Sequence, residues 1–350
     1  MFPMTVIRAG IINVTGYIGT ELARLLYQHP RVELKSVTGR SAAGQKLGEI
    51  FPHLADVDLL ITAELEDNID VAFSAMPHKN SVAVVQSLLG RGIKVIDVSA
   101  DFRLKDINKY SEWYQFNHPA SEMLKESVYG LPELHREEIV SAHLVANPGC
   151  YSTCAILALA PVIKEGLIHP DIIIDSKSGV SGAGRTLSIA THYAEVNENI
   201  YAYAVEGHRH LPEIEQELRN LKPENNLSIT FVPHIVPMTR GILSSCYARL
   251  RDTKPGDSVK DKEELYLLYQ EFYQDSPFVK VMNRPPQTKH AWGNNFCLIY
   301  PTLDSRTGRL IVLSCLDNLV KGGAGQAIQN MNLMFDLPET SGLENMAIYP

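Results

Sequence analysis

The chain has 350 residues, which predicts about two domains at roughly 100 to 200 residues per domain. Hydrophobic residues make up 45% and charged residues 21%, and this balance argues against intrinsic disorder and against a coiled-coil rod. The 32 Lys and Arg residues and 40 Asp and Glu residues give a net charge of −8, and no long Lys/Arg cluster occurs, so we expect neither a nucleic-acid nor a membrane partner.

The first half of the chain alternates β-type runs with helical patterns. We expect strands at Val6–Asn13, Val32–Thr38, Val71–Ala75 and Val95–Ser99, and helices at Tyr17–Gln28 and Ser81–Leu89. This rhythm indicates βαβ units around a parallel sheet. The first half is therefore predicted to be an α/β domain of the Rossmann type.

From Asp171 onward, longer β-type runs often follow one another without a helix, which favours antiparallel pairing. The runs are 172–178, 227–236, 242–250, 296–301 and 310–315. Two helices interrupt them, one from Pro212 and one over Asp261–Asp275, so this part is predicted to be α+β with a mostly antiparallel sheet. A last helix, Ala324–Phe335, is expected to return to the first domain. The expected domains are residues 1–148 with 324–350 and residues 149–323.

The sequence also favours a cytoplasmic location. Its longest apolar stretch, Cys154–Ile163, is about half a membrane span and contains Pro161. Arg8 interrupts the N-terminal apolar run, and no basic region and cleavage site typical of a signal peptide follow. Five sparse cysteines fit a reducing compartment better than a disulfide framework.

A loop between the first strand and the first helix carries the first candidate site. It has the pattern GxxGxxG, with Asn13 in place of the first glycine. The tight turn is still expected, because Asn adopts the left-handed backbone conformation more readily than other non-glycine residues. At this place a dinucleotide pyrophosphate meets the N–H groups of a helix N-terminus. A glycine turn without a ligand is the alternative. The predicted cofactor-binding residues are Thr15, Gly16, Tyr17, Ile18 and Gly19.

The end of the second strand indicates which cofactor is used. An NAD-binding fold places an acidic residue about twenty residues downstream, to bind the ribose 2′-hydroxyl, whereas this chain has Thr38, Arg40 and Ser41. A guanidinium and two hydroxyls suit a 2′-phosphate, so NADP is predicted. The alternative is an ordinary basic turn.

Cys150 is the candidate nucleophile. It follows Asn147-Pro148-Gly149 at the expected start of a helix, where free N–H groups and the helix dipole favour the thiolate. The alternative is a small buried hydrophobic residue, and that description suits the four remaining cysteines, Cys154, Cys246, Cys297 and Cys315.

Three further features complete the candidate site. His208 and His210 bracket an arginine at a helix entrance and are candidates for proton transfer. Arg103 follows a predicted parallel strand, where it is placed to bind an oxyanion. The glycine-rich segment 178–185 suits the approach of an anionic substrate. The predicted substrate-binding residues are Arg103, Ser178, Ser181, Arg185 and Glu213. The alternatives are a solvated charge for Arg103, a flexible loop, and ordinary surface or core histidines.

Together these residues resemble the N-acetyl-γ-glutamyl-phosphate reductases, the NADPH enzymes of arginine biosynthesis, which are relatives of the aspartate-semialdehyde dehydrogenases. The resemblance runs from Gly10 to the last twenty residues. Its most specific pieces are four long motifs in family order, at 147–151, 178–185, 208–214 and 317–327. Asn13 departs from the family's usual glycine, which bears on cofactor affinity rather than on the reaction.

The resemblance implies a mechanism and the roles of individual residues. Cys150 attacks an acyl phosphate to form a thioester, and hydride from NADPH reduces the thioester to the aldehyde. The pair His208 and His210 supplies the acid/base, and we predict that His210 is the proton carrier and His208 a neighbour that orients the substrate. Arg103 faces the phosphate or the carboxylate of the substrate. The first domain is implied to bind NADP, and the second to carry catalysis and dimerisation. Asn318 lies near the nicotinamide. A homo-oligomer, dimer or tetramer, is implied, and no metal is expected because no Cys/His ligand spacing occurs.

Three alternatives remain open. A reductase of lysine biosynthesis that acts on a carrier-protein-bound acyl phosphate differs around the cysteine and the glycine loop, where Asn147-Pro148-Gly149 and Arg185 argue against it. Aspartate-semialdehyde dehydrogenase uses the same chemistry on a shorter substrate, and its motifs match less of the chain. A non-catalytic NADP-sensing regulator is expected to lack the cysteine or both histidines, which are present here.

Overall fold

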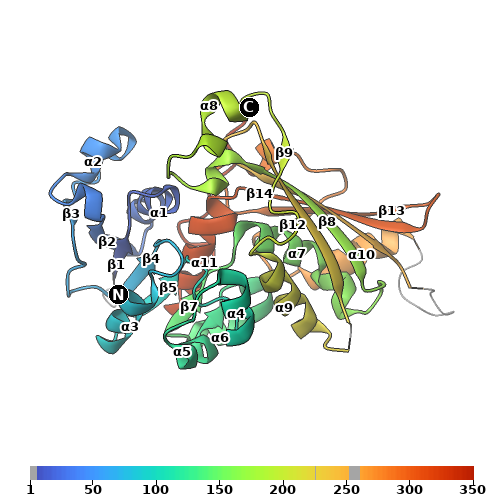
Figure 1. Cartoon of the computed structure of the whole chain (residues 1–350), viewed down its shortest axis with the longest axis horizontal. Helices are drawn as coiled ribbons and strands as arrows, with labels where there is room; N and C mark the ends of the chain where they lie inside the picture. The colour runs from blue at the N-terminus through green and yellow to red at the C-terminus, as the bar shows by residue number, and fades with distance from the viewer. Residues whose placement is uncertain (1–5, 225, 252–260) are drawn as a thin grey trace, which may run out of the picture. The chain divides into compact units, whose positions relative to one another are not determined.

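The computed structural model describes residues 6–224, 226–251 and 261–350, and the chain divides into two compact units (Figure 1). Unit 1 runs up to Pro148 and takes in Gly323–Asn345, while unit 2 comprises Gly149–Gly322 and Met346–Pro350. Residues 1–5 of the predicted first domain lie outside the described residues. The last five residues group with unit 2 because Ile348 N–H donates to the carbonyl of Trp292 at 2.9 Å.

A seven-stranded sheet forms the centre of unit 1, and all of its pairs are parallel, as predicted. The strands, in chain order, are β1 Ile7–Ile12, β2 Val32–Thr38, β3 Ile61–Thr62, β4 Val71–Ser74, β5 Lys94–Asp97, β6 Val128–Tyr129 and β7 Leu144–Ala146. Their order in the sheet is β3-β2-β1-β4-β5-β7-β6. The chain reverses direction across the sheet at the β1/β4 boundary, where open parallel sheets bind ligands at the strands' carboxyl ends.

Helices pack on this sheet along apolar faces. They are α1 Tyr17–Tyr27, α2 Leu47–Ile50, α3 Val82–Gly90, α4 Ile107–Tyr114, α5 Ser121–Glu126, α6 Pro132–Ser141 and α11 Gly325–Met334. One apolar core joins Val85 of α3 and Leu124 of α5 to Val95 of β5. All ten residues of α11 are buried, and α11 contacts α1, α6 and β5. The last predicted helix therefore returns to unit 1.

Unit 2 is built on a second seven-stranded sheet, which is mostly antiparallel, as predicted. Its strands are β8 Asp171–Gly179, β9 Tyr201–Ala202, β10 Ser228–Val236, β11 Ile242–Arg249, β12 Val279–Val281, β13 Cys297–Asp304 and β14 Arg309–Leu316, in the sheet order β12-β13-β14-β11-β8-β10-β9. Two pairs are parallel, β8 with β10 and β12 with β13. These two pairs depart from the antiparallel pairing that predominates in the sheet. The intervening helix α9 Leu211–Leu221 carries the chain back to the same end of the sheet.

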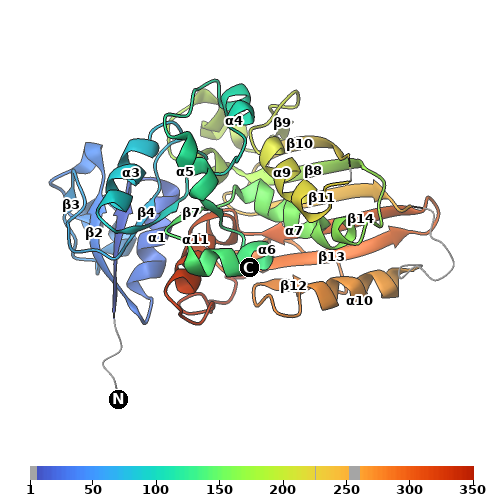
Figure 2. The same cartoon turned by 90° about the horizontal axis from the view of Figure 1, so that it is seen from below.

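Three helices cover one face of this sheet: α7 Cys150–Lys164, α9 and α10 Lys262–Phe272 (Figure 2). A fourth, short helix is α8 Tyr193–Val196. Helix α7 is central because residues 151–163 are all buried. Tyr269 and Tyr273 donate their hydroxyl hydrogens to the carbonyls of Ala158 and Leu157, at 2.6 and 2.5 Å, and so fasten the α10 end to α7. Helix α7, which begins at Cys150, is thus held in place by its burial and by the two hydrogen bonds from the α10 end.

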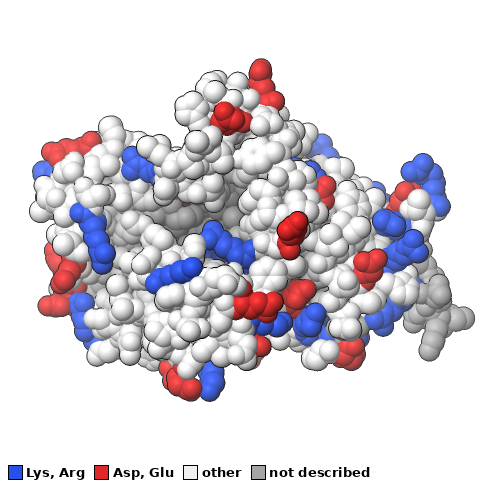
Figure 3. Space-filling model, viewed as in Figure 1, with Lys and Arg blue, Asp and Glu red and all other residues white. Residues whose placement is uncertain are grey.

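Acidic and basic side chains are interspersed over the face of the molecule seen in Figure 3. Within residues 6–224, 226–251 and 261–350, no helix is long and apolar enough to cross a membrane.

Candidate active site

Cys150 is the first residue of α7, as the sequence predicted for a thiolate site. Gly149 precedes it in extended conformation, with φ −71° and ψ 147°, and serves as the N-cap. Cys150 is partly exposed, whereas Cys154, Cys246, Cys297 and Cys315 are buried. The helix dipole therefore acts on a thiol that a reagent can reach.

Gly149 is packed against two residues at the start of α9, the N-cap His210 and Glu213. Its N–H donates to Oε1 of Glu213 at 2.8 Å, and Glu213 is only 1% exposed. A Cβ atom at position 149 would lie 2.5 Å from Nε2 of His210, closer than real Cβ contacts, so the imidazole of His210 rests on the glycine next to the nucleophile. Glu213, which we predicted as a substrate contact, thus holds the backbone just before Cys150.

His208 lies next to His210 in an aromatic cluster. Their ring centroids are 4.8 Å apart, and the N–H of His210 donates to Nδ1 of His208 at 3.1 Å. The rings of Tyr151, Tyr203 and Phe231 pack edge-on against His208 at 5.4–5.7 Å. Burial, together with a smaller effect of the charge of Arg209, lowers the pKa of His208 to about 4. His208 is therefore neutral at pH 7.

Tyr151 and Tyr203 belong to the site although we assigned them no role from the sequence. The Tyr203 hydroxyl donates to the Tyr151 hydroxyl at 3.4 Å, and Tyr151 donates to the carbonyl of His234 at 3.1 Å. Burial raises the pKa of both phenols, that of Tyr203 to about 12, and the charge of Cys150 contributes to each rise. Tyr151 was present in the 147–151 motif, whereas Tyr203 lies outside the motifs, and only tertiary packing brings it here.

Asn318 joins two loops of unit 2. Its Nδ2 donates to Oγ of Ser181 at 2.9 Å, and its Oδ1 accepts the N–H of Gly241 at 2.7 Å. The side chain is 2% exposed. These contacts give Asn318 a structural task in addition to the nicotinamide contact that the resemblance implies.

The glycine-rich segment after β8 has a buried part and an exposed part. Ser178 and Ser181 are buried, and Oγ of Ser178 donates to the carbonyl of Gly179 at 3.1 Å. Arg185 is exposed. The segment therefore offers hydroxyls on its inner side and a guanidinium on its outer side.

Arg103 of unit 1 is 6% exposed. Its Nε donates to the carbonyl of Asn147 at 2.8 Å, and its Nη2 donates to the carbonyl of Val98 at 2.9 Å. These bonds place the guanidinium beside the carboxyl end of β5 and occupy part of its donor capacity.

The dinucleotide-type turn between β1 and α1 has the expected shape. Asn13 adopts the left-handed conformation, with φ 64°, and its Nδ2 donates to the carbonyl of Ala75 at 2.8 Å. A Cβ at Gly19 would collide with the carbonyl oxygen of Asn13 and lie 2.7 Å from Cα of Val14. Gly16 is the N-cap of α1, whose first turn has neither a capping side chain nor an acidic residue. The first N–H groups of α1 therefore receive no hydrogen bond from a capping side chain.

The three residues predicted to bind a 2′-phosphate differ in exposure. Thr38 is 5% exposed, and its Oγ1 accepts the N–H of Asn13 at 3.4 Å. Arg40 and Ser41 are exposed. Thr38 thus supports the turn, while the other two residues face solvent.

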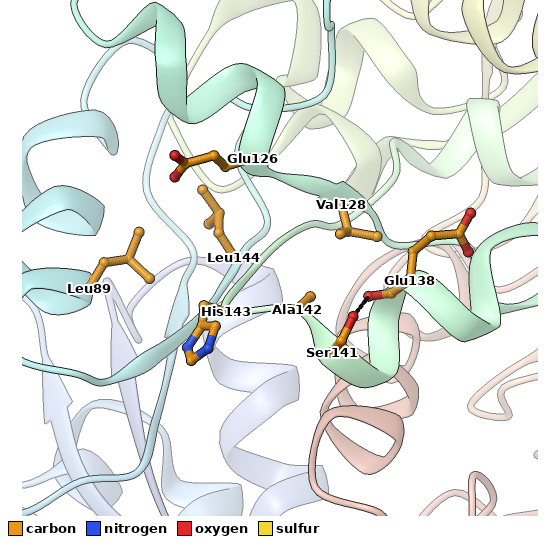
Figure 4. Close-up of a pocket in the computed structure, with 8 residues that line it drawn as sticks. All are labelled: Leu89, Glu126, Val128, Glu138, Ser141, Ala142, His143 and Leu144. Atoms are coloured by element: carbon orange, nitrogen blue, oxygen red, sulfur yellow. Dashed lines mark hydrogen bonds between the residues drawn. The ribbon is translucent and has the colours of Figure 1, made fainter.

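Two open cavities in the described structure are lined by residues outside the predicted site. One of about 340 Å³ lies near the start of β7 in unit 1, and Glu126, Glu138 and His143 are among its lining residues (Figure 4). Beside it, Ser141 donates to the Glu138 carbonyl at 3.2 Å. The other, of about 460 Å³, lies between α7 and α10. Neither contains a predicted site residue. Among the described residues, no group of three or more His, Cys, Asp or Glu side chains is arranged to hold a metal ion.

Two protein-family models match the chain, one in each half. Residues 8–142 match the model of the semialdehyde dehydrogenase NAD binding domain, and residues 150–318 match that of the semialdehyde dehydrogenase dimerisation domain. An N-acetyl-gamma-glutamyl-phosphate reductase of Dehalococcoides mccartyi is 55% identical over 343 residues, covering 98% of this chain and 99% of that protein. Another from Heliobacterium modesticaldum is 50% identical over 355 residues, covering 98% and 100%.

Solved structures of lower identity share the fold. Aspartate semialdehyde dehydrogenase II from Vibrio cholerae, complexed with ASA, has a TM-score of 0.72 at 15% identity and covers 95% of this chain and 99% of its own. Aspartate semialdehyde dehydrogenase with NADP from Candida albicans has a TM-score of 0.71 at 15% identity, with the same coverage. The resemblance expected from the motifs is confirmed by these matches.

Proposed function

Because this chain belongs to the N-acetyl-gamma-glutamyl-phosphate reductase family, we propose that it reduces N-acetyl-L-glutamyl 5-phosphate to N-acetyl-L-glutamate 5-semialdehyde and phosphate with NADPH. The observation that carries the proposal is the partly exposed Cys150 at the start of α7, with His210 against the preceding glycine. This is the arrangement of an activated nucleophile with a proton carrier at hand.

In the proposed mechanism, the Cys150 thiolate attacks the carbonyl carbon of the acyl phosphate. The C–O bond to phosphate breaks, phosphate leaves with the electron pair, and a thioester remains on Sγ. N–H groups at the start of α7 stabilise the oxyanion of the tetrahedral intermediate. His210 protonates the oxygen of the reduced adduct or assists its collapse, which releases the aldehyde and restores the thiolate.

NADP is the proposed cofactor, and the β1–α1 turn fits it. Because Gly19 has no Cβ, the backbone of Asn13 and Val14 packs directly against the start of α1 and keeps the turn tight. The first N–H groups of α1, which no side chain caps, suit a pyrophosphate. Thr15, Gly16, Tyr17 and Ile18 would line this turn, while Arg40 and Ser41 would bind the 2′-phosphate. When bound, NADPH supplies the hydride that reduces the thioester.

The acetylated substrate is proposed on charge grounds. An N-acetyl group removes the α-ammonium charge, so its pocket needs hydrogen bonds and apolar contact, while the carboxylate and phosphate still need cations. The proposed contacts are Arg103, Arg185, Ser178, Ser181 and Glu213. We further propose a homo-oligomer, dimer or tetramer, which the match of residues 150–318 to a dimerisation domain supports.

The reverse reaction tests the function, because the acyl phosphate is labile. Purified protein is mixed with N-acetylglutamate semialdehyde, NADP and phosphate, and NADPH absorbance is followed. We expect phosphate-dependent turnover that Cys150→Ser abolishes while the protein stays folded. Equal turnover of aspartate semialdehyde, or turnover without phosphate, would show that the substrate assignment is wrong, and substantial turnover by Cys150→Ser would exclude the thioester.

A further inference from the structure

A buried carboxylate follows β14 and collects donors from three segments of unit 2. Asp317 is 0% exposed. Its Oδ1 accepts the N–H groups of Leu319 and Val320 at 2.8 and 3.3 Å. Its Oδ2 accepts the N–H of Gly293 at 2.8 Å and lies 3.5 Å from Nη1 of Arg240. Burying a carboxylate is costly unless such donors compensate it, so this one must be well fixed.

The turn that Asp317 organises ends against the nucleophile. The carbonyl of Asp317 accepts the N–H of Gly322 at 2.9 Å. A Cβ placed on Gly322 would lie 2.7 Å from Cβ of Cys150 and 3.2 Å from both Cα of Cys150 and Cδ1 of Leu316. The backbone of Gly322 is therefore in close contact with Cys150, and any movement of the turn reaches the cysteine directly.

We propose that Asp317 is a positioning residue for the nucleophile, fixing the turn 317–322 so that Gly322 confines Cys150. The proposal rests on the proposed function, since it gives the confinement a catalytic purpose. Asp317 acts through the backbone of Gly322, because its own side chain is fully buried. Attack on an acyl carbon requires Sγ in a narrow range of positions, and a displacement of about 1 Å costs roughly a hundredfold in rate.

Two neighbouring features reinforce this role. Asn318, the next residue, ties Ser181 and Gly241 to the same turn. Gly149, on the other side of Cys150, is held by Glu213. Gly149, which precedes Cys150 in the chain, and Gly322, which packs against it, are thus each held by a residue with a buried carboxylate, Glu213 and Asp317.

The main variant is Asp317→Asn. Its amide oxygen can still accept the N–H groups of Leu319 and Val320, but its NH2 group then faces the donors of Gly293 and Arg240. We expect kcat to fall about ten- to a hundredfold while the KM for NADPH changes less than about twofold.

Asp304→Asn is the matched control. Asp304 lies at the end of β13, where its Oδ1 accepts the N–H of Arg306 at 3.0 Å and its Oδ2 lies 3.3 Å from the Arg306 guanidinium. The substitution thus changes the same group, in a similar turn with an arginine partner, outside the proposed site. We expect it to leave kcat unchanged.

Alkylation of Cys150 provides a readout that is independent of turnover. The rate of iodoacetamide labelling at Cys150 is measured against pH by mass spectrometry, and the buried cysteines serve as internal references. We expect Asp317→Asn, but not Asp304→Asn, to shift the midpoint of the profile or to change its plateau rate at least about threefold. A wild-type alkylation profile together with wild-type kcat would overturn the proposal.

Gly322→Ala provides the second test if Asp317→Asn does not fold. It leaves Asp317 in place and forces a methyl group toward Cys150, so the same loss of kcat and altered labelling are expected. Wild-type behaviour of this variant would also overturn the proposal. If instead the wild-type protein shows no phosphate-dependent NADP reduction, the proposed function falls, while the labelling profiles still decide whether Asp317 positions Cys150.

Discussion

At the scale of single residues, the two histidines before α9 have different environments although they are two positions apart. Nδ1 of His208 accepts a backbone N–H, so its proton in the neutral ring is on Nε2. Burial lowers its pKa to about 4, so it carries almost no proton charge near pH 7. His210 lies against Gly149, one residue from the nucleophile. The position of His210 therefore supports its predicted role as the proton carrier, while the substrate-orienting role of His208 stays a prediction.

We therefore predict that the two histidine substitutions have different pH–rate profiles. His210→Asn should lower kcat about a hundredfold to ten-thousandfold, because it deletes the proton carrier. It should also remove the limb of the pH–rate profile near neutrality, where the rate changes with pH. His208→Asn should retain that limb. Steady-state rates measured from about pH 5 to about pH 9, a range that includes the titration of an ordinary imidazole, distinguish the two assignments. Loss of the limb only in His208→Asn would reverse the assignment.

At the scale of elements, the end of β2 and the β1–α1 turn act together. Thr38 closes the strand with its hydroxyl on the N–H of Asn13, and Asn13 in turn binds the carbonyl of Ala75 after β4. The turn is therefore supported from both neighbouring strands. Arg40, just beyond β2, is exposed and is the residue of this group that is suited to read a phosphate.

We predict that Arg40→Ala raises the KM for NADPH about tenfold or more and leaves the KM for NADH nearly unchanged, because a charge-assisted bond to the 2′-phosphate is lost. The control is Lys35→Ala, which removes a cation from β2, the strand before Arg40, where Lys35 pairs with Glu33 at 3.3 Å. Initial rates with both cofactors provide the measurement. Equal weakening for both cofactors would show that Arg40 does not discriminate between them.

At the scale of the whole molecule, buried titratable groups link unfolding to pH in both directions. Burial raises the pKa of Asp97 from 3.8 to about 6, and the charge of Asp101 adds to this, although Ser99 and Ser74 oppose it. The folded state thus holds the proton more tightly than the unfolded chain does. The stabilisation is complete below about pH 4 and is lost as pH rises through about 6. His208 has the opposite sign, because its lowered pKa costs stability as pH falls below 6.5.

In the wild type, the free energy of unfolding should fall by about 3 kcal/mol as the pH rises from about 4 to above 6, because Asp97 loses its proton. In Asp97→Asn this fall should be absent. Urea unfolding of both proteins at several pH values measures it, with Asp56→Asn, an exposed carboxyl of the same unit, as the control. Relative to the wild type, Asp97→Asn should be more stable at pH 8 than at pH 4. A difference independent of pH would contradict the assigned pKa.

Short-range information in the sequence determined much of this protein. Apolar periodicity located β2 at Val32–Thr38, and the glycine pattern located the turn into α1 within a residue. It also placed Cys150 at the start of α7. These features depend on interactions between near neighbours in the chain, such as helix hydrogen bonds and turn conformations, and a local pattern is sufficient to predict them. The family motifs then supplied the chemistry, including the histidine pair.

Tertiary structure alone decided the remainder. The strands β3 and β6 have two residues each, too few for a periodic pattern, and the parallel pairing of β8 with β10 depends on where α9 returns the chain. Tyr203 and Asp317 reach the surroundings of Cys150 from distant positions because long-range packing of α7 on its sheet brings their segments there. Thr38 faces inward for a similar reason, since the hydrogen bond that holds it comes from another strand. Contacts between residues far apart in the chain follow from the packing of whole elements, which no local pattern specifies.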